Sequence, residues 1–535
     1  IIKEAASTTY ENMAWSVGEP SATKEAIVKG DLALTKNITA KKLTLESGSV
    51  TVKSGTVLKV ENEIINKLTA DKFIIEDGGN VIQTNAVTNT GSFTAIANST
   101  PMIFNDATLW SSPVNGQNVR SFSPNTLDKR FYIYNEQTNK FASLFVNDPL
   151  YPNSNLQNPA TYNFENGLGY HIRVANNHTQ IAPGAIFVGK FIGNLNNGNY
   201  TKSVTKQNLG YHLIGNPYPS SLDAKKFLQA NPSVKALYFW THQAPLTSAG
   251  YASNNYASYN LTGGTQAAAG GVIPNGIIGK GQGFIAEINA ATTLKFDNTQ
   301  RTDLSAIFYK NEDDSKRIWI DLFEGTQAKN QILIGYVQDA TNQFDERMDA
   351  KLNQNYDGSA IYSLINNLSD RFVIQGRALP FNNDDTVKLG RDAKANASYT
   401  IQLNNTENIT DDVSIFLYDK VDKQIVDLRK QAYTFNVQEG INNDRFELMF
   451  TNKTLGISDV TKQETVVFKK NNTIVIQSPK EIKSVEVYDI SGRKVLSKST
   501  SGKEISLSNL PKANQVLVIK VINTDQTITN TKILF

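Results

Sequence analysis

Short β runs that end at glycine turns are the feature that most restricts how residues 1–100 can fold. The stretches LTLESGSVTVKSGTVLKV (43–60) and KFIIEDGGNVIQT (72–84) share one form: an alternating run, a Ser-Gly or Gly-Gly step, and a second alternating run. One such run cannot bury its apolar face alone, so successive runs must stack. We therefore predict a parallel β-helix or β-roll of a few rungs over residues 1–100, with Tyr10–Pro20 capping the first rung.

Four features then occur twice, in the same order, over residues 101–303. The first set is LWSSPV (109–114), FYIY (131–134), GLGYHI (167–172) and FVG (187–189), and the second is LIGNPYPS (213–220), LYFW (237–240), GQGFIA (281–286) and LKF (294–296). Two copies of one β unit that pack face to face predict a jelly-roll or a double sandwich. The Gly-x-Gly steps precede strands and lack the third glycine of a dinucleotide site, so we interpret them as points of close backbone approach.

Aromatic residues of the second copy are the best candidates for a binding site. Tyr238, Trp240 and His242 alternate along one strand and share a face, and Tyr251 and Tyr256 come from the following Gly/Ala/Ser/Asn-rich loop. These five residues, the aromatic platform, either fill a sandwich core or stack on a glycan or peptide. In the second case the amides of Asn216, Gln243 and Asn254 are candidates to bind sugar hydroxyls.

Residues 304–454 predict a further β-sandwich, because clear strands recur there between long polar connections. Residues 455–464 have the composition of a linker. Two acidic stretches, Glu312–Asp314 and Asp345–Asp349, are either Ca²⁺ ligands or solvated loops. No other cofactor is expected.

Composition excludes several classes of function. The 53 basic and 50 acidic residues leave a formal net charge of +3, which predicts no broad field for nucleic acid. Cysteine is absent, the four histidines lack metal-ligand spacing, and no His-Glu-x-x-His or Gly-x-Ser-x-Gly motif occurs. No run is long enough for a membrane-spanning helix, and the first residues lack an initiator Met and a signal-peptide core. We expect a non-enzymatic mature product or the C-terminal part of a longer protein.

The last segment, residues 465–535, consists of seven short β runs bounded by Asn, Gly, Pro or Ser, the pattern of a small Ig-like sandwich. Within it, VYDISGRKV (487–495) predicts a hairpin with Gly492 in the turn. The segment ISLSNLP (505–511) follows, and the chain ends in the strand KILF (532–535).

This set of motifs resembles the type A C-terminal sorting domain of proteins exported by the type IX secretion system of Bacteroidetes. The Gly-x-Tyr step usual in that family after Leu-Pro is replaced here by Ala513–Gln515. The region from LWSSPV to NDRFEL (443–448) also resembles part of large surface proteins that carry the same domain.

The resemblance implies export across the outer membrane to the cell surface or the medium. Its implied partners are an outer-membrane shuttle barrel, a translocon barrel and a sortase-like protease, without nucleic acid. The residues that it assigns to recognition are Tyr488, Asp489, Gly492, Arg493, Leu510, Pro511, Lys532, Ile533, Leu534 and Phe535. The body is then expected to be an adhesin-like binding protein with a glycan as its candidate ligand. The alternative is a polysaccharide hydrolase or lyase whose catalytic part precedes Ile1 or lies in the β-helix.

Overall fold

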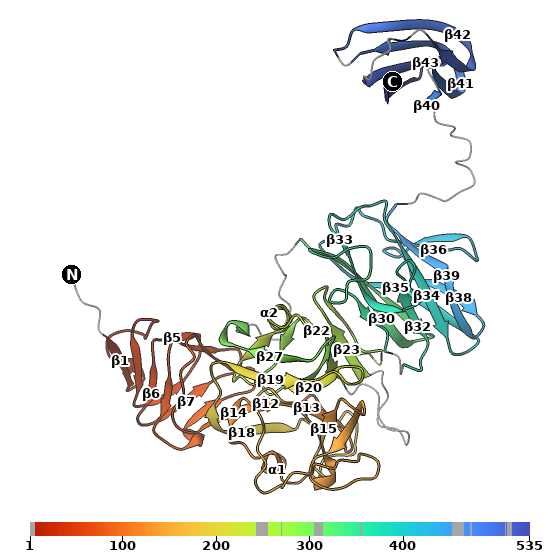
Figure 1. The fold of residues 1–535 in the computed structure, drawn as a ribbon. Helices are drawn as coiled ribbons and strands as arrows, with labels where there is room; N and C mark the ends of the chain where they lie inside the picture. Colours follow the sequence, from red (N-terminus) through yellow and green to blue (C-terminus); the bar gives the residue numbers. More distant parts are fainter. Residues whose placement is uncertain are drawn as a thin grey trace, which may run out of the picture. The chain divides into compact units, whose positions relative to one another are not determined.

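The computed structural model describes residues 6–241, 255–268, 270–303, 314–353, 356–451, 465–470, 473–489, 491–508, 510 and 516–535. The chain forms two compact units, Ile1–Thr451 and Asn452–Phe535 (Figure 1). Both are built from β-strands, so the all-β class predicted from the sequence is confirmed. Among the described residues, no helix is both long and apolar enough to cross a bilayer.

A parallel β-helix, called the solenoid here, opens the first unit, as predicted (Figure 1). Its strands form three sheets. The first contains β2 (Ala14–Trp15), β1 (Ser7–Glu11), β3 (Glu25–Val28), β6 (Leu43–Leu45) and β9 (Ile64–Asn66). The second contains β4 (Asp31–Ala33), β7 (Ser49–Val52), β10 (Phe73–Ile75) and β12 (Phe93–Asn98), with η1 (Ala70–Lys72) before β10. The third contains β5 (Ile38–Ala40), β8 (Val57–Val60) and β11 (Asn80–Gln83).

Stacked aliphatic side chains hold the rungs together. Ala26 lies in register with Leu43, and Leu43 with Ile64, and all three are buried in one core. Gly48 has a φ of +77°, and a Cβ there would overlap the backbone of Gly30 in the rung before. The Ser47-Gly48 step is therefore needed for rung-to-rung contact, whereas a Cβ on Gly55 would meet nothing within 4 Å.

Two β-sheets with the same strand order follow the solenoid. We call this part of the chain the double-sheet region, and each sheet with its neighbouring elements is one half of it. The first half (Phe93–Leu195) has the order β13 (Ala107–Trp110), β17 (Tyr170–Arg173), β15 (Phe131–Asn135) and β16 (Lys140–Ser143). The second half (Tyr200–Phe296) has the order β20 (Tyr211–Gly215), β26 (Gly283–Ile288), β22 (Val234–Trp240), β23 (Tyr256–Tyr259) and β24 (Gly264–Thr265). In the first half β13 pairs with β17, which pairs in turn with β15. In the second half β20 pairs with β26, which pairs in turn with β22.

The remaining elements of the halves also correspond. In each half the strand that opens it pairs with the strand that closes it: β12 with β18 (Val188–Leu195), and β19 (Tyr200–Val204) with β27 (Thr292–Phe296). A short helix follows each first strand: α1 (Val119–Phe122) and α2 (Ala224–Ala230). The minor elements are β14 (Val114–Asn115), η2 (Asp128–Arg130), β21 (Ser221–Asp223), β25 (Ile277–Ile278), η4 (Asn298–Gln300) and β28 (Arg301–Thr302).

The Gly-x-Gly steps lie where the two halves touch. Ser111 N–H donates to the Gly281 carbonyl (2.9 Å), and Gly215 N–H donates to the Gly167 carbonyl (3.2 Å). A Cβ on Gly169 would meet the carbonyl oxygen of Ile214 at 2.5 Å. These glycines permit close backbone approach, which is the role predicted for them.

One continuous sheet curls around a large core in residues 314–451, and we call this part the half-barrel (Figure 1). A second, smaller core includes Trp319, Leu333 and Ile374. Its path is β37 (Gln424–Asp427), β36 (Phe416–Asp419), β39 (Gly440–Met449), β34 (Thr386–Ala393), β32 (Ala360–Ser363), β33 (Phe372–Ala378), β30 (Gln327–Val337), β29 (Lys316–Glu324), β35 (Ala397–Glu407) and β38 (Tyr433–Val437), and β31 (Ala350–Lys351) pairs with β33. Arg445 joins the two ends of this path, because it binds Asp419 on β36 (2.7 Å) and stacks 5.0 Å from the ring of Phe435 on β38.

The second unit contains one five-stranded sheet, formed by β40 (Val466–Lys470), β41 (Thr473–Tyr488), β42 (Lys494–Leu507), β43 (Val516–Asn523) and β44 (Ile528–Leu534). We expected separate strands on either side of Pro479 and of Gly502. Instead β41 runs through Pro479 and β42 runs through Gly502. The pairing of the two strands changes register between Gln477 and Ile482. Each strand therefore pairs on both sides of an irregularity, so one long hairpin replaces the four separate strands that were expected.

The last rung of the solenoid is sealed by the double-sheet region. Strand β12 pairs antiparallel with β18, and Val81 N–H of β11 donates to the Pro219 carbonyl (2.9 Å). Asn80 accepts from Ser221 N–H at 2.7 Å. Arg301, which is 5% exposed, donates to the Val81 carbonyl and to Ser220 (3.1 Å).

Replacement of Arg301 by methionine should loosen this seal. Neither Ser220 nor the Val81 carbonyl is a carboxylate, so the variant loses these hydrogen bonds without leaving a buried anion. It also removes the donor that Arg301 supplies to the Val81 carbonyl. The expected cost is about 2 kcal/mol, or roughly 30-fold faster amide exchange over Asn80–Gln83. Lys59→Met, on the exposed face of β8, is the control and should leave this exchange unchanged.

Candidate functional site

The described members of the aromatic platform lie between the sheets of the two halves. The Trp240 ring lies 5.1 Å from that of Tyr256 and 6.2 Å from that of His171 in the first half. The Trp240 ring N–H donates to the Ala107 carbonyl (2.9 Å). Tyr238 belongs to the same cluster, while His242 and Tyr251 lie outside the described residues. This geometry favours the packing interpretation for Trp240.

Asn216 is not available to a ligand. Its side chain is fully buried and donates to the carbonyls of Ser220 (2.8 Å) and Gly279 (3.0 Å), while its oxygen accepts from Tyr218 N–H (3.0 Å). It fixes the Asn-Pro-Tyr-Pro turn, so the prediction that it binds sugar hydroxyls is wrong. Gln243 and Asn254 lie outside the described residues.

A narrow cleft separates part of the platform from the half-barrel. Its volume is about 50 Å³, and its lining includes Tyr238, Tyr256, Gln266, Asn330, Gln331, Lys351 and Tyr356. Tyr238 donates to Glu287 (2.7 Å), and Tyr356 donates to the Lys329 carbonyl (2.9 Å). Gln331 donates to the buried Asp321 (2.8 Å) and accepts from Gln266 N–H (3.1 Å). A cleft of this volume has room for only a few water molecules, and the polar groups named here already have protein partners.

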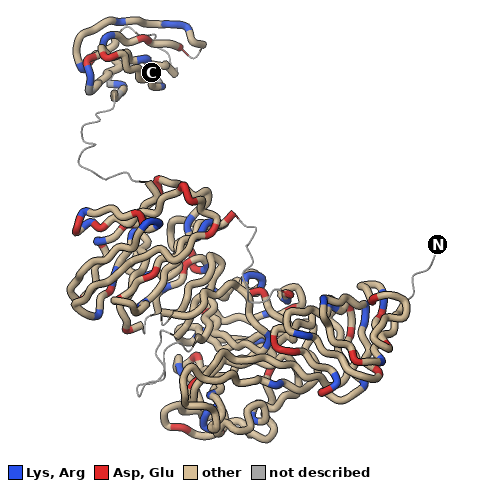
Figure 2. Tube along the Cα trace, turned by 180° about the vertical axis from the view of Figure 1, so that it is seen from behind, with Lys and Arg blue, Asp and Glu red and all other residues tan. Residues whose placement is uncertain are grey.

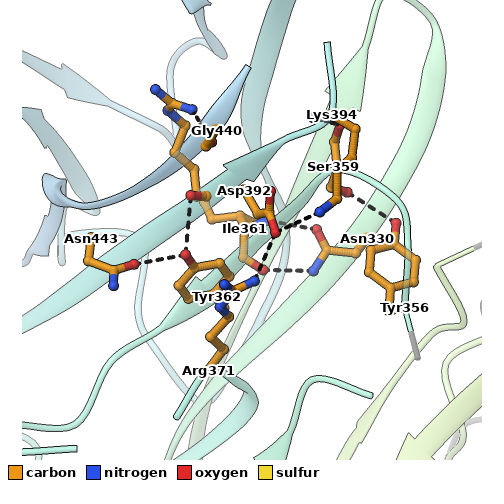
Figure 3. Close-up of polar contacts among 11 residues, drawn as sticks. Asn330, Tyr356, Ser359, Ile361, Tyr362, Arg371, Asp392, Lys394, Gly440 and Asn443 are labelled. Carbon is orange, nitrogen blue, oxygen red and sulfur yellow. Dashed lines mark hydrogen bonds and ion pairs between the residues drawn. The ribbon is translucent and has the colours of Figure 1, made fainter. Parts of the chain in front are cut away.

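The half-barrel contains a polar network that includes Asn330 and Tyr356 from the lining of this cleft (Figure 3). The Asn330 side chain exchanges two hydrogen bonds with the backbone of Ile361, at 2.7 and 2.9 Å, as a paired strand would. Arg371 (2.8 Å) and Lys394 (3.0 Å) converge on the buried carboxylate of Asp392. The network joins β30, β32 and β34, which gives these residues a structural role.

The candidate Ca²⁺ loop organises a contact within the first unit. The buried carboxylate of Asp349 accepts from Asp345 N–H (2.7 Å) and Gly376 N–H (2.8 Å). The neighbouring Met348 carbonyl accepts from Thr262 of the second half (2.7 Å). The described part of the chain contains no group of three His, Asp or Glu side chains placed to hold a metal ion. Glu312 and Asp313 lie outside that part.

Several glutamates on the solenoid surface are paired with lysines. The pairs are Lys42–Glu63 (2.6 Å), Lys67–Glu46 (2.7 Å) and Lys53–Glu76 (2.7 Å). Hydrogen bonds from these lysines lower the pKa of each glutamate. Blue and red segments accordingly alternate along the solenoid in Figure 2. These pairs resemble ladders between rungs.

The hairpin predicted in the second unit is organised by Asp489. Its carboxylate accepts from Ser491 N–H (3.0 Å) and Arg493 N–H (3.1 Å), and Gly492 has a φ of +80°. Arg493 keeps 79% of its side chain exposed although it donates to Asp489 (3.0 Å). Tyr488 donates to Glu486 (2.9 Å), whose pKa is lowered to about 2 mainly by the hydrogen bond from Lys494.

The other predicted recognition residues divide by exposure. Lys532 is exposed, whereas Leu510 and Phe535 are buried and Ile533 packs against the core. Pro511 and the side chain of Leu534 lie outside the described residues. Sequence patterns could not separate these two groups, because alternation predicts two faces without saying which one is covered.

Trp240→Ala tests the packing interpretation. Loss of the indole should leave a cavity between the two sheets and lower the free energy of unfolding by about 3 kcal/mol. Thermal unfolding of the wild-type and variant chains measures this loss, with Trp240→Phe as the conservative variant. An unchanged transition together with lost binding on a glycan array would instead identify a ligand-contacting ring.

Asp349 predicts a pH dependence of stability. Burial raises the pKa of Asp349 to about 7. The folded chain then binds this proton more tightly than the unfolded chain, so stability falls as pH rises from about 4 to 7 and is level above that range. Asp349→Asn should remove this contribution, measured as a smaller fall in melting temperature between pH 5 and pH 7.5. The control is Asp411→Asn, at an exposed position, which should keep the wild-type slope.

Two protein-family models together match nearly the whole chain. Residues 455–535 match the family described as "Domain of unknown function (DUF8694)". No curated protein matches the chain. Residues 5–450, which include the solenoid, both halves and the half-barrel, match the family described as "Domain of unknown function (DUF8693)", and the chain belongs to that family.

Proposed function

We propose that this protein is a cargo of the type IX secretion system, exported across the outer membrane to the cell surface or the medium. The second unit is its export signal, read by the shuttle and translocon barrels. The observation that carries the proposal is the hairpin at Asp489–Arg493, which belongs to a separate compact unit and combines a buried carboxylate with an exposed guanidinium. A carrier can read such a unit on many cargos, because recognition does not involve the attached body.

The body serves binding or spacing, without catalysis, as in an adhesin. The seal between solenoid and sheets suits a rigid spacer, since each rung is fixed to the next and the last rung to the second half. Three glutamates on the solenoid surface are held in pairs with lysines, which suits a structural role for those three side chains. A glycan is the candidate ligand of the body, and a sortase-like protease is a further candidate partner of the signal.

Export of a reporter tests the signal. A fluorescent protein fused to residues 455–535 should leave the cells of a Bacteroidetes host and appear at the surface or in the medium. The same fusion without Lys532–Phe535 should stay in the periplasm. Fractionation measures both, with a periplasmic enzyme as the leakage control. Retention of both fusions would contradict the proposal.

A further inference from the structure

A five-residue pattern repeats on the first sheet of the solenoid. It reads EAIVK (25–29) at β3, KLTLE (42–46) at β6 and EIINK (63–67) at β9. The second and fourth residues of each copy are buried. Because side chains alternate along a strand, the first, third and fifth residues of each copy face outward. These outward positions line up from rung to rung, since the strands pair in parallel.

The middle positions form an uncharged row across the sheet. Backbone pairing aligns five residues in this row, which are, in order, Thr9, Ile27, Thr44, Ile65 and Thr90. Ile27 and Ile65 are half-buried and lie outside the core cluster that holds their neighbours Val28 and Ile64. All five side chains of the row are β-branched, so they form a strip of methyl groups that loses little rotamer freedom on contact.

Charged residues flank this row on both sides. One flank consists of Glu25, Lys42 and Glu63, and the other consists of Lys29, Glu46 and Lys67. Each of the three rungs thus carries one acid and one base on opposite sides of the row, and their order reverses at each step along the solenoid. We call the row and its two flanks the checkered face.

The flanks stay accessible although they are paired within the chain. The Lys42–Glu63 and Lys67–Glu46 pairs are described above, and the Nζ atom of Lys29 lies 3.8 Å from a carboxylate oxygen of Glu46. The side chains of Lys29 and Lys67 nevertheless keep 43% and 54% of their area exposed. Each flank therefore presents its charges to solvent, where the charges of another molecule can meet them.

We propose that the checkered face binds the checkered face of a second copy of this chain. A twofold axis parallel to the solenoid sets each rung opposite the same rung of the second copy, and each flank opposite the other flank. Facing charges then have opposite signs at all three rungs, where the facing pairs are Glu25 with Lys29, Lys42 with Glu46, and Glu63 with Lys67. The two uncharged rows meet between them. This inference concerns the body alone and does not depend on the proposed export.

The charge pattern also selects the direction of pairing. A twofold axis parallel to the strands would set Glu25 opposite Glu63 of the second copy, and Lys42 opposite Lys42, so like charges would meet. Like charges that face one another suppress an arrangement, and exposed pairs of opposite sign add little affinity. The flanks therefore set direction and register, whereas the uncharged row supplies the contact area.

The area of the checkered face limits the strength of the association. With rungs about 4.8 Å apart and residues about 3.3 Å apart, five residues on each of five rungs cover on the order of 400 Å². A stable complex buries about 800 Å² on each partner. We therefore expect a weak and reversible dimer that salt weakens further, because its facing charges lie near solvent.

Reversal of one flank at a time tests the proposal in the purified full chain. The first variant carries Glu25→Lys, Lys42→Glu and Glu63→Lys, and the second carries Lys29→Glu, Glu46→Lys and Lys67→Glu. Both variants keep the alternation of sign within each flank, so the pairs inside the chain are preserved. In either variant alone, however, the facing flanks of two copies have like charges at all three rungs. Sedimentation velocity over a concentration series at low salt measures the association.

The wild-type chain is expected to dimerise, and each variant alone is expected to have a dissociation constant raised roughly 10-fold or more. An equimolar mixture of the two variants should recover the association, because each flank then meets opposite signs on the other variant. A chain with all six substitutions should recover it as well. Such recovery also shows that the variants are folded.

Thr44→Arg tests the uncharged row with a matched control. An arginine at the middle rung should hold the two faces apart and weaken the association about 10-fold. Thr39→Arg is the control, because Thr39 has the same central, half-buried position in β5 of the third sheet as Thr44 has in β6. This control should associate like the wild-type chain.

Several outcomes would overturn the proposal. The wild-type chain could stay monomeric throughout the series, or the mixture of reversed variants could fail to associate. One reversed variant alone could associate as tightly as the wild-type chain, which would indicate a shifted register or another surface. A monomeric wild-type chain that binds a glycan array, with binding lost in Thr44→Arg, would identify the checkered face as a ligand surface instead.

Discussion

The open backbone edge of the last solenoid rung is the constraint on which the first unit depends. A stack of parallel strands ends in N–H and C=O groups that need partners, and an uncovered end invites association with other chains. Here the partners come from the two halves: β18 extends the sheet of β12, and the turn at Pro219–Ser221 satisfies β11. Arg301 completes the seal with a buried guanidinium whose pKa is lowered to about 10 by burial. The solenoid and the two sheets therefore form one folded body and are not separate domains.

Close backbone contact governs the double-sheet region in the same way. Each half places a Gly-x-Gly step against the first strand of the other half, so the two sheets meet with little room between their edges. Aromatic side chains fill the space that remains: Trp240 reaches across to Ala107 and to the ring of His171. Burial lowers the pKa of His171 to about 3, so this imidazole stays neutral and packs as an aromatic ring. The Gly-x-Gly steps and Trp240, which look functional in the sequence, thus form the contact between the two sheets.

Local patterns were enough to predict the rungs, the Gly492 hairpin and the recurrence of four features, because each depends on residues that are close in sequence. The corresponding strands indeed occupy equivalent positions in the two halves. Contacts between distant segments could not be predicted. The side chain of Asn216 was a candidate to bind a ligand, yet it donates to the Gly279 carbonyl. Residues 304–454 were expected to form a sandwich, and the half-barrel instead has one curled sheet, in which Arg445 meets Asp419 and Phe435 from distant parts of the sequence. The cleft combines Tyr238 with Gln331 from separate regions, which no spacing indicates.

The two units differ in how their charged groups are used, and this difference bears on function. In the half-barrel, buried ion pairs such as Arg377–Asp385 (2.6 Å) and Arg445–Asp419 (2.7 Å) hold strands together, and the Lys–Glu pairs of the solenoid join its rungs. Such pairs contribute specificity of packing more than affinity for a partner. In the second unit Asp489 is buried in its turn and accepts from Arg493, whose side chain stays 79% exposed. The ion pair Lys494–Glu486 (2.6 Å) joins strands there as the pairs of the first unit do, and Arg493 at the hairpin is the exposed group on which the proposed recognition rests.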